Sequence, residues 1–99
     1  MQRTDFLLIK LMEECCEAAQ RASKQIQFGR DEVQEGQSLT NGQRLREEVM
    51  DVIAIAHLLS EEGFIEPVGE ADMAAHVLLK REKLIKYLHL SYRLGMVRT

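Results

Sequence analysis

The sequence predicts an all-α fold, an antiparallel helical bundle whose core is completed by oligomerisation. Apolar residues recur at alternating intervals of three and four along three segments, which is the period of an amphipathic helix. No run is a credible strand, and there is no internal repeat. The 99 residues contain no Pro/Gly/Ser-rich linker, so we expect one domain spanning residues 1–99. A chain this short, built from long amphipathic helices, needs partners to cover its apolar stripes.

The first helix is expected from Asp5 to about Gln27. It should end near Gly29, because the run that follows, up to Gly42, is rich in Gly, Gln, Asp and Ser and has no periodicity. A loop of this length is often functional or mobile. The apolar stripe of this helix is formed by Leu8, Met12, Cys15, Ala19, Ala22 and Ile26.

The second helix begins with a capping box, in which Thr40 is followed three residues later by Gln43. It should stop at Gly63, because glycine adopts the conformation that ends a helix without steric cost. One face of this helix carries Leu45, Val49, Val52, Ala56 and Leu59.

The third helix is expected from Ala71 to about Leu94, after a turn at Pro67 and Gly69, and is closed by Gly95. Lys80 and Arg81 interrupt its apolar stripe. Two interpretations remain open: the stems of both side chains pack while their charged ends reach water, or a cationic pair faces an anion in a cleft. The stripe itself consists of Met73, Val77, Leu84 and Leu88.

The charge is weakly acidic overall and uneven along the chain. A formal net charge of -3 argues against a general binder of nucleic acid or anionic membrane, so neither partner is expected. From Lys80 to Thr99 there are six Lys or Arg against one acid, Glu82, whereas most acids lie between Glu13 and Asp72. This asymmetry suits a site where carboxylates hold a cation and a basic segment meets an anion.

The compartment is predicted to be the cytoplasm. No stretch approaches the length of an apolar membrane span, and the N-terminal residues lack the pattern of a secretory signal. Cys15 and Cys16 are adjacent, so they cannot link distant parts of the fold, and a bond between neighbours is strained. Reduced thiols are therefore expected.

Two pairs of carboxylates at helical spacing are the candidate functional residues. Glu14 and Glu17 share one side of the first helix, and Glu48 and Asp51 repeat the arrangement on the second. Each pair lies beside an apolar stripe, so packing of the two stripes would bring four carboxylates together. Four like charges need a cation, and Mg²⁺ is the natural choice for an all-oxygen site, with Mn²⁺ as the alternative. The plainer interpretation is a solvated acidic face that pairs with Lys10, Arg21, Arg44 or Arg46.

The two pairs together resemble a known family. Glu13-Glu14-x-x-Glu17 followed by Glu48-x-x-Asp51 is similar to the EExxE…ExxD signature of MazG-type, all-α nucleoside triphosphate pyrophosphatases, to which phosphoribosyl-ATP pyrophosphatases and dimeric dUTPases are related. The resemblance covers mainly residues 5–62 and includes the apolar run 52–59. It implies a MazG-like helical domain and a homo-oligomer, either a homodimer or a homotetramer.

The resemblance also implies an activity: hydrolysis between the α and β phosphates of a ribo- or deoxynucleoside triphosphate, giving a monophosphate and pyrophosphate. Mg²⁺ held by the four carboxylates would bind phosphate oxygens and lower the pKa of the attacking water. Glu13, Glu14 and Glu17 are the candidate catalytic residues, with Glu13 either an outer ligand or a group that orients the water. The triphosphate tail would be neutralised by a basic segment only loosely similar to that of related enzymes, namely Lys80, Arg81 and Lys83.

Other sites fit the sequence less well. A zinc site lacks a second Cys pair, and the histidines have no ligand spacing to Cys15 and Cys16, so these cysteines are interpreted as packing residues. A ferritin-like di-iron site needs Glu three residues before His, whereas Ala54, Met73 and Lys86 precede His57, His76 and His89. A non-enzymatic helical dimerisation or interaction module with an acidic, metal-binding face remains open, and metal-dependent nucleotide binding would separate it from the enzyme.

Overall fold

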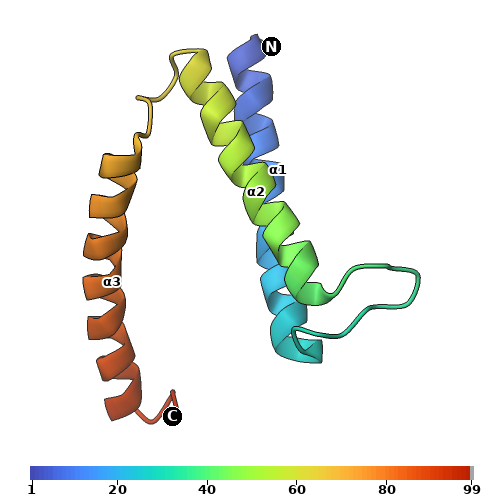
Figure 1. Cartoon of the computed structure of the whole chain (residues 1–99), viewed down its shortest axis with the longest axis vertical. Coiled ribbons are helices and arrows are strands. Elements are labelled where there is room, and N and C mark those ends of the chain that lie inside the picture. Colours follow the sequence, from blue (N-terminus) through green and yellow to red (C-terminus); the bar gives the residue numbers. More distant parts are fainter. Residues whose placement is uncertain (99) are drawn as a thin grey trace. The chain divides into compact units, whose positions relative to one another are not determined.

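The computed structural model describes residues 1–98 and is helical throughout apart from its connections. The helices are α1 (Arg3–Phe28), α2 (Asn41–Glu61) and α3 (Glu70–Arg93), as labelled in Figure 1. No strand occurs in this range, so the all-α prediction is confirmed. The predicted helix limits agree closely with these bounds.

Helices α1 and α2 lie side by side and antiparallel, which makes a hairpin (Figure 1). At its open end Arg3 Nε lies 3.0 Å from Glu62 Oε1, an ion pair between the start of α1 and the end of α2. At its loop end the predicted capping box is confirmed. Thr40 Oγ1 accepts a hydrogen bond from the backbone N–H of Gln43 (3.1 Å), and Gln43 Oε1 accepts one from the backbone N–H of Thr40 (2.8 Å).

The connection between α1 and α2, residues 29–40, is tied to the start of α2 through Asn41. This side chain is 1% exposed, and its Nδ2 donates to the carbonyl oxygen of Gly29 (2.9 Å) and to Glu32 Oε1 (3.2 Å). The backbone N–H of Gly42 donates to the carbonyl oxygen of Arg30 at 2.9 Å, and a Cβ at Gly42 would lie 2.7 Å from Arg30 Cγ. A glycine at this position thus lets the loop lie close against α2.

The side of α1 that faces α2 is not the predicted apolar stripe. Met12 and Ile26 are 59% and 87% exposed, and Cys15 is exposed as well. In a single chain, α2 therefore leaves Cys15 and most of this stripe uncovered, with Leu8 half-buried, and packing of Cys15 stays a prediction. Leu59, 1% exposed, is the fully buried apolar residue of residues 1–98. The half-buried positions along α1 instead include Leu7, Leu11, Glu14, Ala18, Arg21 and Gln25.

The physical reason is that two helices can cover only one side of each other. Leu7 and Leu11 form a second apolar set on α1, and this set, not the longer stripe, contacts α2. At about 100° per residue, the predicted stripe lies about a quarter turn away from the contact. On α2, Val49 (43% exposed) and Ile53 (51%) likewise lie about a quarter turn from Leu59.

On each helix, the exposed stripe is offset from the contact between α1 and α2 by a rotation about the helix axis. The two rotations have the same sense along the chain, and α1 and α2 run in opposite directions. Both uncovered stripes therefore lie on one face of the hairpin. We call it the apolar face, formed by Met12, Cys15, Ala19, Ala22, Ile26, Val49 and Ile53. Rotation in the opposite sense leads from the contact to Glu17 on α1 and Asp51 on α2. The hairpin thus has an apolar face on one side and a carboxylate face on the other.

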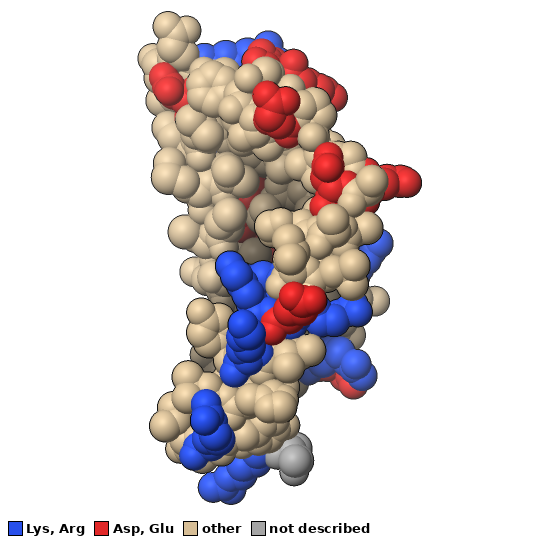
Figure 2. Space-filling view, turned by 90° about the vertical axis from the view of Figure 1, so that its left-hand side faces the viewer, with Lys and Arg blue, Asp and Glu red and all other residues tan. Residues whose placement is uncertain are grey.

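The chain divides into two compact units, residues 1–67 and residues from Val68 onward, and the prediction of a single domain remains untested. In the second unit, α3 by itself buries none of its residues. Its predicted stripe is joined by exposed apolar side chains on other sides, among them Leu79, Tyr87 and Leu90. A helix with exposed apolar side chains on more than one side is typical of one that packs against other helices. Lys and Arg side chains gather over its C-terminal half (Figure 2).

Helices α1, α2 and α3 do not resemble membrane-spanning segments. In residues 1–98, none of the three combines the length and hydropathy that crossing a bilayer requires.

Candidate metal centre

Three of the predicted carboxylates converge where α1 and α2 meet. Glu14, Glu17 and Glu48 each offer one oxygen, and these oxygens all lie within 4.8 Å of one another. Glu14 and Glu48 come from the sides of the helices that face each other and are half-buried, whereas Glu17 is exposed at the flank. The antiparallel packing of two Glu-x-x-acid pairs thus brings together three of the four predicted carboxylates.

Asp51 lies three residues beyond Glu48 on α2, a little less than one turn, and flanks the group. It is outside the tight set of three, but its negative charge acts on both Glu14 and Glu48. The fourth predicted carboxylate therefore lies beside the cluster and contributes to its field.

Two oxygens of the cluster have no partner. Glu14 Oε2 and Glu48 Oε2 are buried and accept no hydrogen bond. A buried carboxylate oxygen without a donor or cation is costly, because it has lost its water and gained nothing in exchange. These oxygens therefore mark a position where a cation would be stabilised.

No basic side chain neutralises the cluster within residues 1–98. The ion pairs there are Arg3–Glu62, Lys10–Glu13, Arg30–Asp31 and Arg46–Glu47. Lys10 and Arg46, two of the four predicted partners of a solvated acidic face, are thus paired with acids outside the cluster. The other two, Arg21 and Arg44, pair with no acid at all.

Crowding of the carboxylates raises two pKa values. The pKa of Glu48 rises from 4.5 to about 7, because burial disfavours its charged form, Glu17 hydrogen-bonds with it, and the negative charges of Glu17, Asp51 and Glu14 oppose its ionisation. The pKa of Glu14 is also raised, first by desolvation and then by the charges of Glu17 and Asp51. Near neutral pH the cluster therefore holds a proton where a cation could bind instead.

The donor set fits a hard divalent cation. It consists of carboxylate oxygens only, two of them buried and unpaired, which suits Mg²⁺ or Mn²⁺ better than a metal that prefers sulfur or nitrogen. Cys15 and Cys16 are exposed thiols outside this group. The structure thus offers a group of acidic residues able to hold a metal, and the identity of the ion remains a prediction.

Glu13 lies next to the cluster in sequence and lines a surface hollow of α1 together with Glu17, but it is not one of the three clustered carboxylates. Its Oε2 is 3.0 Å from Lys10 Nζ, and the pair is exposed on α1. The predicted role of Glu13, orienting the water or supporting a ligand from outside, remains a prediction.

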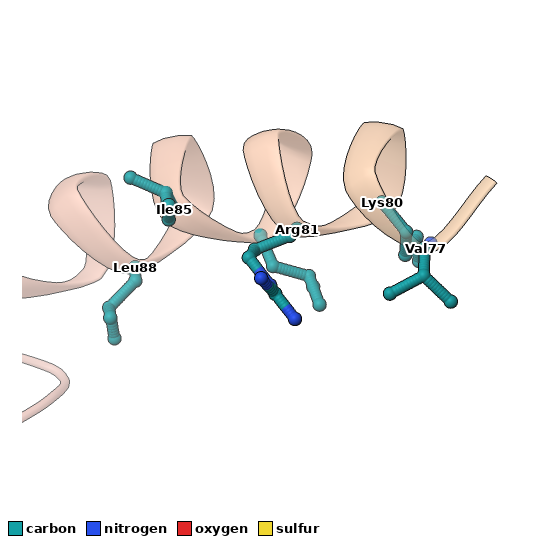
Figure 3. A pocket seen from close by; sticks show the side chains of 6 residues that line it. Val77, Lys80, Arg81, Ile85 and Leu88 are labelled. Carbon is teal, nitrogen blue, oxygen red and sulfur yellow. The ribbon is translucent and has the colours of Figure 1, made fainter. Parts of the chain in front are cut away.

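The predicted phosphate-binding residues Lys80, Arg81 and Lys83 are on α3, in the second unit. Lys80 and Arg81 border a shallow apolar hollow on this helix, with Arg81 projecting to the same side as Val77 and Leu88 (Figure 3). Lys83 lines a neighbouring hollow with His76, Leu79 and Lys86. Their predicted role towards the substrate is not tested by these positions.

The comparisons with known proteins leave the site to be interpreted from its geometry. No protein-family model, curated protein or solved structure matched the chain.

Sequence reasoning considered Arg21 and Arg44 only as partners for acids and missed their placement. Arg21 follows Glu17 by four residues, and Arg44 precedes Glu48 by four. Because α1 and α2 are antiparallel, both spacings lead from the cluster towards the loop end of the hairpin. This matching four-residue spacing was the signal in the sequence that could have placed both arginines on the loop side of the cluster.

Proposed function

We propose that the chain is a Mg²⁺-dependent nucleoside triphosphate pyrophosphohydrolase that cleaves the α–β phosphate bond and releases a monophosphate and pyrophosphate. The observation that carries the proposal is the convergence of Glu14, Glu17 and Glu48, with two buried oxygens that lack any partner. The EExxE…ExxD resemblance links this type of carboxylate arrangement to that reaction. A cytoplasmic location belongs to the same proposal, since nucleotides and reduced thiols are found there.

The chain's own residues would act by holding and positioning. Glu14, Glu17 and Glu48 would hold the cation, with Asp51 adding negative charge at the flank. When bound, Mg²⁺ would draw charge from phosphate oxygens and lower the pKa of the attacking water. The water oxygen bonds to the α phosphorus, the bond from that phosphorus to the bridging oxygen breaks, and pyrophosphate leaves with the electron pair. The proton lost by the water passes to a carboxylate at the site, one of the predicted catalytic residues Glu13, Glu14 and Glu17.

The test is a screen of ribo- and deoxynucleoside triphosphates with Mg²⁺, in which pyrophosphate and orthophosphate are measured separately. We expect monophosphate and pyrophosphate in equal amounts, loss of both with a chelator, and recovery on adding Mg²⁺. Glu17→Gln should abolish release, whereas Glu47→Gln should not, because Glu47 adjoins Glu48 but pairs with Arg46 outside the cluster. A protein that binds Mg²⁺ yet releases no pyrophosphate from any of these substrates would refute the proposal.

We also propose that the working form is a homodimer or homotetramer. The apolar face of the hairpin and the apolar sides of α3 are support for it, because exposed stripes of this size are typical of surfaces that pack against another chain. Analytical ultracentrifugation of Ile53→Asp tests this, and a mass near that of one chain is expected. Met50→Asp is the matched control, since Met50 is also exposed on α2 but points away from both faces of the hairpin.

A second function is favoured by the same uncovered surfaces: a non-enzymatic helical dimerisation or interaction module with an acidic, metal-binding face. Calorimetry with Mg²⁺ and a non-hydrolysable nucleoside triphosphate separates the two. An enzyme should bind the nucleotide much more tightly when Mg²⁺ is present, whereas an interaction module should bind Mg²⁺ without any effect of nucleotide.

A further inference from the structure

Arg21 is a half-buried arginine on the side of α1 that faces α2. Its Nη1 is buried and donates no hydrogen bond. Glu17, four residues earlier, is in the favourable orientation for a helical ion pair, yet no such pair forms. A buried guanidinium nitrogen without an acceptor is destabilising, so an anionic group from outside the chain would be stabilised there.

Arg44 occupies the corresponding position on α2 and is held by the loop. Its Nη1 donates to Gln34 Oε1 at 2.8 Å. Gln34 belongs to the connection that Asn41 ties to the start of α2. The guanidinium of Arg44 is therefore positioned by a neutral amide, which leaves its charge uncompensated.

Arg21 and Arg44 differ from the other arginines of the hairpin in having no carboxylate partner. Arg3, Arg30 and Arg46 each pair with a carboxylate, whereas Arg21 and Arg44 do not. The hairpin, residues 1–67, has thirteen acids against seven Lys or Arg, so acidic partners are not scarce. Among the arginines of the hairpin, these two lack a carboxylate partner, which marks them as a place where charge is available.

Arg21 and Arg44 also share a place relative to the carboxylate cluster. Each is four residues from a cluster member, about 6 Å along its helix axis, and both displacements run towards the loop. Each is also rotated from the contact between the helices in the sense that leads to the carboxylate face, away from the apolar face. A ligand held by a cation at the cluster would therefore extend towards two guanidinium groups on the same face.

We propose that Arg21 and Arg44 bind the diphosphate part of a ligand that is also held by the metal at Glu14, Glu17 and Glu48. Guanidinium groups recognise phosphate oxygens through paired, charge-assisted hydrogen bonds, and two of them offset much of the charge of a diphosphate. The same chemistry is offered by free pyrophosphate and by the tail of a nucleoside triphosphate. This inference rests on the proposed function for the presence of the metal, and it assigns the phosphate contacts to the hairpin itself.

The test is calorimetric titration of inorganic pyrophosphate into the full chain with saturating Mg²⁺. Arg21→Ala and Arg44→Ala should each weaken pyrophosphate binding about tenfold or more, the loss expected for hydrogen bonds to charged groups. Arg21→Lys should recover part of the affinity, because it restores charge without the paired donors. The matched control is Arg46→Ala, which removes an arginine on the same helix that already pairs with Glu47.

Binding of Mg²⁺ alone and the circular dichroism spectrum serve as controls for folding and should be the same for all variants. Pyrophosphate affinities of Arg21→Ala and Arg44→Ala within about twofold of the unchanged chain would overturn the inference. Arginine-dependent binding of pyrophosphate in a chain that hydrolyses no nucleotide would support the inference while refuting the proposed function. If both substitutions left nucleotide hydrolysis and pyrophosphate binding unchanged, the proposed function would be supported and the inference about the arginines refuted.

Discussion

The α1–α2 hairpin and α3 are both amphipathic, but they use their polar residues differently. In the hairpin, charged groups lie where two helices meet, and Glu14, Glu48, Arg21 and Arg44 are half-buried. On α3, the charges of Lys80, Arg81 and Lys83 stand on an exposed helix among apolar side chains. Placing charge at a helix contact is costly and needs a compensating ligand, whereas charge on an exposed helix does not. This contrast supports the proposal that the specific chemistry lies in the hairpin and that α3 packs against other chains.

The largest expected effect is on the cluster itself. Glu48→Gln should weaken Mg²⁺ binding about 100-fold or more, because it removes a ligand oxygen that no neighbouring group replaces. Without metal, the same change should raise the thermal stability near pH 8, because it removes a charge that Glu17, Asp51 and Glu14 oppose. Calorimetry and thermal unfolding measure the two effects. A loss of stability in the metal-free chain would contradict the idea that the cluster is assembled for a cation.

The next effect concerns the separate roles of α3 in assembly and of the hairpin in metal binding. Leu84→Asp should shift the chain to a smaller assembly, because Leu84 lies in the apolar stripe of α3 and is 54% exposed in one chain. Mg²⁺ affinity should remain within about twofold, since α3 supplies no cluster carboxylate. Sedimentation reports the mass and calorimetry the affinity, with Leu84→Met as a control that keeps the apolar volume. If Leu84→Asp abolished metal binding, the division of roles between the two units would be wrong.

A third effect concerns pH and stability without metal. The pKa of Glu48 is about 7 in the folded chain against 4.5 as its ordinary value, so the folded state binds the extra proton between these limits. The free energy of unfolding should therefore fall as pH rises through this window and be most favourable at its acid end. With saturating Mg²⁺ the trend should reverse, because the metal needs deprotonated carboxylates. Thermal unfolding at several pH values, with chelator or with Mg²⁺, checks the sign, and Glu48→Gln should flatten the slope.

The smallest effect is at the start of α2. Thr40→Ala removes the hydroxyl that caps the Gln43 N–H and should cost about 1 kcal/mol of unfolding free energy. Thr40→Ser keeps the cap and should cost much less. Denaturant unfolding of both variants measures the difference. If Thr40→Ala and Thr40→Ser had equal unfolding free energies, the loop contacts of Asn41, and not the cap, would determine where α2 begins.

Much of the fold could be predicted because local signals mark its boundaries. Thr40 with Gln43 begins α2, and Gly29 and Gly95, both with positive φ, follow the ends of α1 and α3. The carboxylate cluster was predictable for a related reason. Three-residue spacing on two adjacent antiparallel helices leaves few other arrangements once the helices pack.

The side of α1 that packs against α2 was not predictable from periodicity. Two apolar sets compete on α1, and the longer one, which includes Met12 and Ile26, is the one left exposed. Periodicity measures which sides of a helix avoid water, not which neighbour covers each side. The same limit explains why Arg21 and Arg44 were considered only as partners for acids, since their unpaired state depends on the packing.

The two adjacent thiols have a practical consequence. Cys15 belongs to the apolar face, whereas Cys16, one residue on, points away from α2, and both are exposed in a single chain. Alkylation depends on access to the thiolate, so neighbouring cysteines in unlike surroundings should react at different rates once the apolar face is covered. Mass spectrometry of a timed alkylation would then count one fast and one slow site in the assembled protein, and two fast sites in separate chains. The relative alkylation rates of the two cysteines therefore report on assembly without any engineered label.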